Sequence, residues 1–450
     1  MKNHFELLVI GGGPAAITLA KNLGGEIDMA IIRPEDYSMI YCAMPYAIEG
    51  LLESSKTLKK DSIVTETGAE LIRDTVSSVD FEEKHVGCLS GDEYSWDRLV
   101  IATGAEPILP PMPGSDKEGV TVFKSQRHME RIAERVERGL RDAVVVGAGA
   151  IGAELAQALA AKEVNTHLVD IAESVLPNLA DAEMSSQVRE ELEAAGVRLH
   201  LGRKVESLEG DSAVSAAVLD DGSRLQAQLV VFAVGMKPNT GLFTGSGLEM
   251  ARDGIVVDGA MRSNIEDVYA VGDCVSYYSA ITGERSGGKL ATNAVPMARV
   301  LADNLKGRTR EYEGFYNGAA TKAGNLYIGG TGLKEAEARA RYDAVVAYAE
   351  FTTAFPIMPT AKKVKLKLIA DRKTGKILGG QVVSGEPVTD KIDQITMAVQ
   401  YGITARRLLD FSYSSQPWQS FFPAHNLLVK AAEKLVAEME SAGRHELKAV

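Results

Sequence analysis

The clearest hydrophobic pattern along the 450-residue chain is a short apolar run that leads into a glycine-rich turn. Residues 7–10 read Leu-Leu-Val-Ile, residues 11–16 are glycines, a proline and alanines, and a helical pattern follows over residues 17–23. An apolar run of strand length before a glycine turn and a helix start is typical of a buried parallel strand. The pattern therefore predicts a strand, a tight turn and a helix.

The same arrangement recurs further along the chain. Residues 143–146 read Ala-Val-Val-Val, residues 147–152 form a second glycine-rich turn, and residues 153–161 have a helical pattern. A further segment of strand length follows each helix, at residues 29–32 and at residues 166–169. Because one nucleotide-binding domain needs only one such turn, the repeat predicts two of these domains.

The pattern changes in the last third of the chain. Segments of strand length occupy residues 344–348, 364–369 and 377–383, with polar and apolar positions alternating, which is typical of an antiparallel sheet. Helical patterns follow at residues 390–401 and 426–439. We therefore expect an α/β fold with two Rossmann-like nucleotide-binding domains and a C-terminal α+β domain.

The composition is that of a globular protein, with 45% hydrophobic and 24% charged residues. The net charge of −12 argues against a nucleic-acid partner and against docking on anionic lipid, because both need a basic surface. No apolar run has the length of a membrane span or of a signal-peptide core. Cys42, Cys88 and Cys274 are too few for a disulfide framework or a zinc site. We expect a cytoplasmic protein without a metal, in which an exposed cysteine is more often catalytic than structural.

Each glycine turn has the features of a diphosphate-binding site. The first glycine makes the bend, the second lets the backbone approach a pyrophosphate, and the third position must be small so that helix and strand can pack. The diphosphate then lies at the positive end of the helix dipole. The candidate cofactor-binding residues are Gly11, Gly13, Pro14, Ala15 and Ala16 in the first turn, and Gly147, Gly149, Ile151 and Gly152 in the second.

The two units differ at the end of their second strand. The second unit has Asp170 there, whose carboxylate can accept hydrogen bonds from both ribose hydroxyls and would repel a 2′-phosphate. This favours NADH over NADPH, although Asp170 could also be a simple turn residue. The first unit has Arg33 instead, so either Arg33 contacts a diphosphate or Glu35 reaches the ribose.

Several further segments resemble the pyridine nucleotide-disulfide oxidoreductases, and the resemblance covers essentially the whole chain. Residues 102–107 are similar to the strand that joins the FAD and NAD domains of that family, and residues 235–240 to its return crossing. Residues 269–273, Tyr-Ala-Val-Gly-Asp, resemble the FAD motif whose Asp bonds the ribityl chain. Residues 290–294 are similar to the helix start that points at the flavin pyrimidine ring.

The resemblance implies a discontinuous architecture. Residues 1–111 and 240–315 would form an FAD-binding domain, residues 112–239 an inserted NAD-binding domain, and residues 316–450 a domain that forms a homodimer. It also implies further cofactor-binding residues, which are Arg33, Val76, Ala102, Thr103, Gly104, Gly235, Asp273, Ala291 and Thr292.

The segment around Cys42 is similar to the redox-cysteine segment of the single-cysteine branch of this family. That branch includes coenzyme A-disulfide reductases, NADH oxidases and NAD(P)H polysulfide reductases. Ser38 stands four residues before Cys42, and the pair is the predicted centre of catalysis. The two-cysteine members have a second cysteine five residues further on, which this chain lacks, so Cys42 can form a disulfide in turnover only with substrate. We expect Cys42 to attack a sulfur–sulfur bond as a thiolate, and Cys88 and Cys274 to be packing residues.

The expected activity is the FAD-dependent reduction by NADH of a disulfide, a polysulfide or a coenzyme A derivative. Pro14 stands where peroxidase and oxidase members carry a His, which disfavours peroxide or dioxygen as the acceptor. Gly24 and Gly25 stand where coenzyme A-disulfide reductases place an Arg, and Phe355 replaces one of their two tyrosines. The alternatives are an NADH oxidase, a reductase of an electron-carrier protein, a membrane quinone reductase and a redox sensor.

The C-terminal region supplies two further candidates for catalysis. Tyr413 is similar to the second of those tyrosines, and His425 could donate a proton to the leaving sulfur, although a lone His is more often structural. The resemblance implies that both lie near the active site of a partner subunit. The apolar face of residues 426–439 is expected to form a subunit interface rather than a membrane contact.

Overall fold

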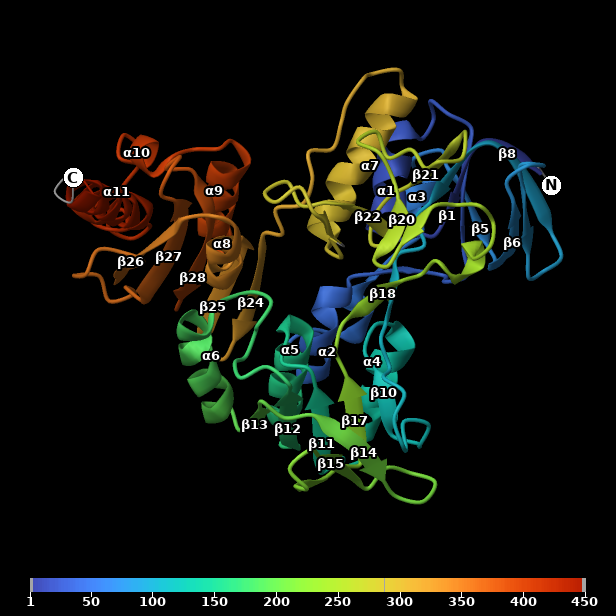
Figure 1. Ribbon diagram of the computed structural model, residues 1–450. Helices are drawn as coiled ribbons and strands as arrows, with labels where there is room; N and C mark the ends of the chain where they lie inside the picture. Colours follow the sequence, from blue (N-terminus) through green and yellow to red (C-terminus); the bar gives the residue numbers. More distant parts are fainter. Residues whose placement is uncertain (1–2, 287, 447–450) are drawn as a thin grey trace. The chain divides into compact units, whose positions relative to one another are not determined.

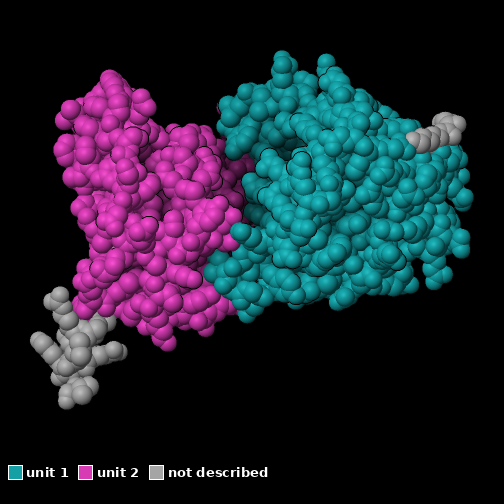
Figure 2. Space-filling view, turned by 90° about the horizontal axis from the view of Figure 1, so that it is seen from above, with its two compact units in different colours: residues 1–108, 123–131, 235–315 teal, residues 109–122, 132–234, 316–450 magenta. Residues whose placement is uncertain are grey.

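The chain divides into two compact units, which Figure 2 distinguishes by colour. Residues 3–286 and 288–446 are described by the computed structural model. Unit 1 comprises Met1–Ile108, Phe123–Arg131 and Gly235–Phe315, and unit 2 comprises Leu109–Val122, Ile132–Val234 and Tyr316–Val450. Because unit 2 joins the second glycine turn to the C-terminal region, the three domain boundaries expected from the sequence stay a prediction.

Unit 1 is built on a sheet whose central strands are parallel (Figure 1). The central strand β1 (His4–Ile10) lies between β2 (Met29–Arg33) and β8 (Glu93–Ile101). Parallel strands β5 (Glu70–Arg73) and β21 (Val268–Ala270) pair with β2 and β8. The sheet then continues from β8 through antiparallel β7 (His85–Cys88) to β6 (Val76–Asp80).

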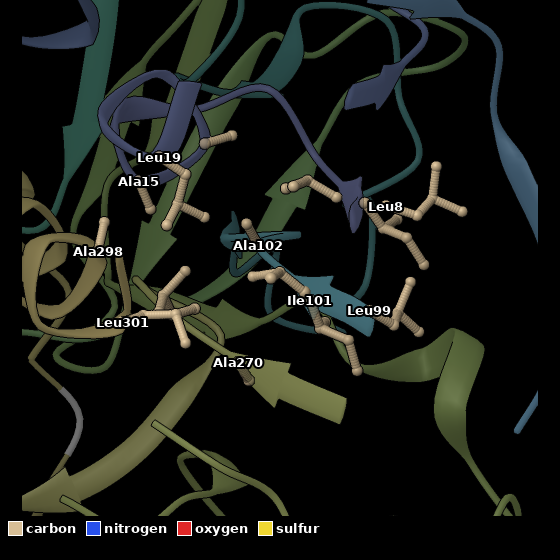
Figure 3. Close-up of a cluster of buried hydrophobic side chains, with 14 of the residues drawn as sticks. Leu8, Ala15, Leu19, Leu99, Ile101, Ala102, Ala270, Ala298 and Leu301 are labelled. Carbon is tan, nitrogen blue, oxygen red and sulfur yellow. The ribbon is translucent and has the colours of Figure 1, made fainter. Parts of the chain in front are cut away.

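Two helices bury their apolar faces in the core of unit 1. Helix α1 (Pro14–Leu23) begins with a proline. The first helical turn accepts this residue because a backbone N–H at that position would have no acceptor within the helix, so the N–H that proline lacks is not missed. Helix α7 (Ala291–Leu305) packs beside α1. Leu19 and Leu301 of these helices meet Ile101 of the sheet in one buried cluster (Figure 3). The predicted first strand–turn–helix unit is confirmed.

Residues 38–49 of unit 1 carry Cys42 and are called the redox segment here, after the family segment that they resemble. They form a strand that runs into two short helical turns. Strand β3 (Ser38–Met39) is followed by the 3-10 helix η1 (Tyr41–Ala43) and by α2 (Met44–Glu49). The 3-10 helix η2 (Ser54–Thr57) then leads into β4 (Leu58–Lys59), which pairs antiparallel with β3. Two segments resemble the strands that join the FAD and NAD domains of the family, and they are called the crossing segments here. Their strands, β9 (Ala105–Pro107) and β18 (Met236–Pro238), pair antiparallel in unit 1.

Unit 2 contains a second parallel sheet. Its strand order is β10 (Val120–Val122), β17 (Leu229–Phe232), β11 (Asp142–Val146), β12 (Asn165–Asp170) and β13 (Arg198–Leu201). Helix α5 (Ala150–Ala160) follows the second glycine turn, and α6 (Ala182–Ala194) precedes β13. An antiparallel side sheet is formed by β14 (Val205–Glu209), β15 (Ala216–Leu219) and β16 (Arg224–Gln226). The second predicted strand–turn–helix unit is therefore confirmed.

The C-terminal part of unit 2 is an antiparallel sheet covered by helices (Figure 1), as the alternating pattern predicts. Its strand order is β24 (Ala319–Ala323), β25 (Leu326–Gly332), β28 (Ile377–Ser384), β27 (Lys363–Asp371) and β26 (Ala344–Thr352). Its helices are α8 (Glu335–Arg341), α9 (Thr389–Gln400), α10 (Ala405–Leu408) and α11 (Leu427–Glu446).

The apolar face of α11 is covered by the chain's own sheet. Leu427, Leu428, Ala431, Leu435 and Val436 are buried, and α11 packs on β26 and β27. The expectation that this face forms a subunit interface is wrong, because the antiparallel sheet needs an apolar cover and α11 supplies it. In the stretches 3–286 and 288–446, no helix is both long and apolar enough to cross a membrane.

A buried ammonium group ties helix α6 to the C-terminal sheet of unit 2. Lys367 of β27 is only 1% exposed and pairs with Asp181, with Glu335 and with Glu183. The Nζ–oxygen distances to Asp181 and Glu335 are 2.7 and 2.6 Å. The hydrogen bond from Lys367 lowers the pKa of Glu335. Asp181 and Glu183 lie at the start of α6, so this cluster fixes that helix to the C-terminal sheet.

We expect Lys367→Met to lower the free energy of unfolding at pH 7 by about 3 kcal/mol, because three carboxylates lose their shared cation. The pKa of Glu335 is lower in the folded protein than in the unfolded chain. The stability that its pairing with Lys367 provides is therefore present above the unfolded pKa and is lost as the pH falls through the folded pKa. The difference in the free energy of unfolding between wild type and variant should therefore shrink below about pH 4. Urea unfolding at both pH values measures this. Lys365→Met on the same strand is the control, and equal losses for both variants at pH 7 would contradict the role of the cluster.

Candidate active site

Cys42 lies on an exposed turn of unit 1. It is the middle residue of η1, directly before α2, and its thiol is free. Cys88 and Cys274 are also free but buried, and burial raises the pKa of each to about 11. Cys42 is therefore the one thiol of the three that a dissolved substrate can reach, and the prediction that the other two are packing residues is confirmed.

The first glycine turn has room only for glycine at its first position. Gly11 has φ of +107°, and a Cβ added there would lie 2.2 Å from the carbonyl oxygen of Ala102. Gly13 is the N-cap of α1, and a Cβ added to it would meet nothing within 4 Å. The turn thus leaves open space in front of the unpaired N–H groups of a helix start, which fits the diphosphate of a dinucleotide.

Arg33 lies beneath this turn and connects it to the redox segment. The side chain is 2% exposed, and a Cβ added to Gly12 would lie 2.2 Å from Arg33 Cδ. The guanidinium donates to Ser38 Oγ and pairs with Asp61, which also pairs with Arg73. Of the two alternatives that the sequence left open, the structure shows Arg33 within reach of the turn, whereas Glu35 is exposed.

The other predicted flavin-binding residues of unit 1 gather at the carboxyl ends of its parallel strands. Ala102 follows β8 and donates its N–H to the carbonyl of Ile10, the last residue of β1. A Cβ added to Gly272 would contact the Cβ atoms of Ala15 and Ala294, at 3.5 and 3.6 Å. These contacts bring together the turn at residues 11–16, the residues Ala102, Thr103 and Gly104, Asp273, and Ala291 and Thr292 at the start of α7.

Thr103, a member of that group, also donates its hydroxyl to the carbonyl of Asn239, 2.7 Å away, which links the two crossing segments. Two further candidates lie outside the group. Gly235 precedes β18 and has φ of +118°. Val76 begins β6 opposite Cys88, on the antiparallel side of the sheet. The cofactor roles of Gly235 and Val76 stay predictions, as do those of the residues in that group.

Asp273 offers an acceptor without a partner. Burial raises the pKa of this carboxyl, and Lys124 and Lys289 oppose the rise. Among the residues the structure describes, none donates a hydrogen bond to its side chain. A half-buried carboxylate with free oxygen lone pairs fits the hydroxyl groups of a ribityl chain.

Lys124 is a site residue that the sequence did not indicate. Its ammonium group lies 4.9 Å from the ring centroid of Tyr41, the neighbour of Cys42. Burial lowers the pKa of Lys124, and Asp273 opposes this. Lys124 belongs to no recognisable motif and lies between the two glycine turns in the sequence, so only the fold of unit 1 brings it to the redox segment.

The second glycine turn lies in unit 2 and repeats the geometry of the first. Gly147 has φ of +108°, and a Cβ added to Gly152 would lie 1.8 Å from the Gly147 carbonyl oxygen. Gly149 is the N-cap of α5, and the side chain of Ile151 is exposed in its first turn. Both oxygens of Asp170 accept backbone N–H groups, from Ala148 at 2.5 Å and from Ala172 at 2.7 Å. Asp170 therefore shapes the turn and still has lone pairs for a ribose.

Tyr413 and His425 belong to the C-terminal part of unit 2. The hydroxyl of Tyr413 donates to the carbonyl of Pro423, 2.7 Å away. The ring of His425 stacks on Phe351 with centroids 4.7 Å apart and an interplanar angle of 8°. Both residues line the same pocket of this part, and their catalytic role stays a prediction.

Comparisons with known proteins give one consistent picture. The family model described as "Pyridine nucleotide-disulphide oxidoreductase" matches residues 5–298, and that of its dimerisation domain matches residues 319–421. The chain is 31% identical over 453 residues to an NADH oxidase of Methanocaldococcus jannaschii, covering 96% of this chain and 99% of that protein. It is also 31% identical over 417 residues to an NAD(P)H coenzyme A polysulfide/persulfide reductase of Pyrococcus horikoshii, covering 89% and 92%. The solved structure of an NAD-dependent persulfide reductase from A. fulgidus is similar with a TM-score of 0.91 and 29% identity, over 97% of this chain and 83% of that one.

We expect Gly11→Ala to weaken flavin binding at least about tenfold, because the left-handed backbone disfavours any side chain and the added methyl meets a carbonyl oxygen. The flavin absorbance that stays with the purified protein, followed by titration of the apoprotein, measures the effect. Gly241→Ala is the matched control in unit 1, since its added Cβ meets nothing within 4 Å. Full flavin content in Gly11→Ala would show that this turn is not the flavin site.

Proposed function

The chain belongs to the pyridine nucleotide-disulphide oxidoreductase family, and from this we propose that it binds FAD in unit 1 and uses NADH to reduce a sulfur–sulfur bond through Cys42. The single observation that carries the proposal is that Cys42 is exposed while the other cysteines are buried, on a segment that Arg33 links to the first glycine turn. The family supplies a flavin and a pyridine nucleotide; FAD, NADH and the sulfur acceptor are proposals for this chain.

FAD is favoured over a mononucleotide flavin by the shape of unit 1. The open turn in front of α1 suits a diphosphate, and Asp273 at the neighbouring strand end suits a ribityl chain. A flavin with both features at once is a dinucleotide. When bound, the flavin relays the two electrons of the reduced pyridine nucleotide to the sulfur substrate.

The chemistry of the chain's own residues begins at Cys42. Its thiolate attacks one sulfur of the acceptor, so a bond forms between Cys42 Sγ and that sulfur while the acceptor's sulfur–sulfur bond breaks and a thiolate or sulfide leaves. Two electrons and a proton then cleave the new bond, release the second thiol and restore the Cys42 thiolate. Ser38 positions this segment through its bond to Arg33, and the cation of Lys124 lies beside Tyr41.

An NADH oxidase is the second candidate, since the relative from Methanocaldococcus jannaschii carries that name. Pro14 argues against it. This residue occupies the first position of α1, where its side chain can neither donate nor accept a proton during reduction of dioxygen. The persulfide reductases among the relatives and solved structures instead favour a sulfur acceptor.

We further propose a homodimer. Residues 319–421 match the dimerisation domain of the family. Trp418, near the end of that stretch, is 58% exposed. Phe422, the first residue after the stretch, is 45% exposed. Large aromatic side chains that are this exposed suit a surface covered by a second copy of the chain.

We expect Cys42→Ser to lower the rate of polysulfide or disulfide reduction by at least about a thousandfold, because a serine hydroxyl is not ionised at neutral pH and cannot take part in thiol exchange. NADH should still bleach the flavin absorbance of this variant under anaerobic conditions. Cys88→Ala is the control and should keep the wild-type rate. If Cys42→Ser turns over sulfur acceptors normally, the proposed mechanism is wrong.

We expect Asp170→Asn to raise the KM for NADH about tenfold, since one charge-assisted hydrogen bond to the ribose is lost. The KM for NADPH should fall relative to that for NADH, because the charge that repels a 2′-phosphate is gone. Steady-state kinetics with both nucleotides test this, with the exposed Asp211→Asn as the control. An unchanged KM ratio would show that Asp170 serves only the turn.

A further inference from the structure

Three lysines occupy a short stretch of unit 1 that runs beside the redox segment. Residues 54–60 read Ser-Ser-Lys-Thr-Leu-Lys-Lys and contain no carboxylate, although the chain as a whole has a net charge of −12. The side chains of Lys56, Lys59 and Lys60, here called the lysine strip, are all exposed. Within the described part of the chain, none of the three ammonium groups forms an ion pair or a hydrogen bond. The strip is therefore an uncompensated local positive charge.

Backbone pairing holds the lysine strip against the segment that carries Cys42. Lys59 of β4 lies opposite Ser38 of β3, and residues opposite each other in an antiparallel pair present their side chains on the same face. The N–H of Ile40, two residues before Cys42, donates to the carbonyl of Thr57 at 2.7 Å. The hydroxyl of the buried Thr57 donates to the carbonyl of Ser54 at 2.6 Å, which fixes the turn that carries Lys56.

The carboxylates that flank the lysine strip do not neutralise it. Asp61 follows the strip directly, but it pairs with Arg33 and Arg73, so the two arginines together exceed its charge. Glu53 precedes the strip and accepts a bond from Ser55, 3.5 Å away, rather than from a lysine. Residues 54–60 thus keep an excess of positive charge next to β3, the strand that leads to Cys42, in a protein that is otherwise acidic.

We propose that the lysine strip recruits an anionic sulfur acceptor to Cys42, a molecule that carries negative charge close to its sulfur–sulfur bond. This inference rests on the proposed function and names the class of its substrate. A net charge of −12 would repel such an anion over most of the surface, whereas a local cluster of cations raises its concentration and its rate of encounter at one place. An inorganic polysulfide and a disulfide that bears phosphate groups share this chemistry. A neutral disulfide gains nothing from it.

The test compares two triple variants of the full-length flavin-loaded enzyme. K56Q/K59Q/K60Q removes the lysine strip, and K363Q/K373Q/K376Q removes the same charge from exposed lysines of unit 2. The kcat/KM with NADH is measured anaerobically for inorganic tetrasulfide, coenzyme A disulfide and neutral 2-hydroxyethyl disulfide. For the first variant we expect kcat/KM to fall about tenfold for an anionic acceptor at low ionic strength and to change less than about twofold for the neutral one. The wild-type advantage should fade as salt is raised to about 0.2 M.

The source of the anion follows from which acceptor is affected. A loss with tetrasulfide alone indicates inorganic polysulfide, and a loss with coenzyme A disulfide alone indicates a phosphate-bearing disulfide; either result supports the strip. Three results would overturn the proposal. These are an unchanged kcat/KM for both anionic acceptors in K56Q/K59Q/K60Q, an equal fall in kcat/KM for the neutral disulfide, or an equal fall in kcat/KM in the unit 2 control.

Failure of the strip and failure of the proposed function give different results in the same assay. Inactive Cys42→Ser together with an unaffected K56Q/K59Q/K60Q variant overturns the strip and leaves the function standing. A fully active Cys42→Ser enzyme overturns the function, whatever the lysines do. Flavin absorbance and the rate at which NADH bleaches it should be the same in both triple variants, which shows that they are folded and loaded.

Discussion

A buried arginine holds the cofactor turn and the redox segment of unit 1 in one piece. Arg33 ends the second strand of the sheet, its Cδ fills the space that a side chain at residue 12 would need, and its guanidinium faces Ser38 and Asp61. Because a guanidinium stays charged in a protein, it can be buried only where acceptors surround it. The position of Ser38 is therefore set by the same strand end that shapes the glycine turn, and Cys42 follows four residues later.

The two glycine turns share one backbone geometry but have side chains of opposite charge next to them. Arg33 and Asp170 each end the strand that follows the helix of their own turn, and each reaches the second residue of that turn. The first unit places a cation beneath the turn and the second places a carboxylate there. A cation favours a diphosphate, whereas a carboxylate favours ribose hydroxyls and disfavours a further phosphate. Under the proposed function, the choice between the two cofactors would depend on one residue in each unit and not on the fold.

The hydrophobic pattern predicted the strands and helices well because burial leaves its period in the sequence. The buried parallel strands before Gly11 and Gly147 are continuous apolar runs, and β26 of the last sheet alternates in part, whereas β28 of that sheet is buried throughout. The pattern of residues 427–436 revealed that one helix face is buried but not what covers it, so the wrong partner was assigned. Asp61 and Lys124 were not predictable, since their contacts with Arg33 and Tyr41 join segments 28 and 83 residues apart that carry no motif.

Several cations lie near the Cys42 segment although the chain as a whole is acidic, and that difference has a physical consequence. Arg33, Lys124 and the lysine strip place cations around the Cys42 segment of a protein with a net charge of −12. At physiological salt, charges act over only about 8 Å, so a substrate close to Cys42 responds mainly to the charges of that segment and less to the net charge of the whole chain. In the proposed reaction the lysine strip therefore favours an anionic acceptor, whereas it would give no advantage to dioxygen, which carries no charge.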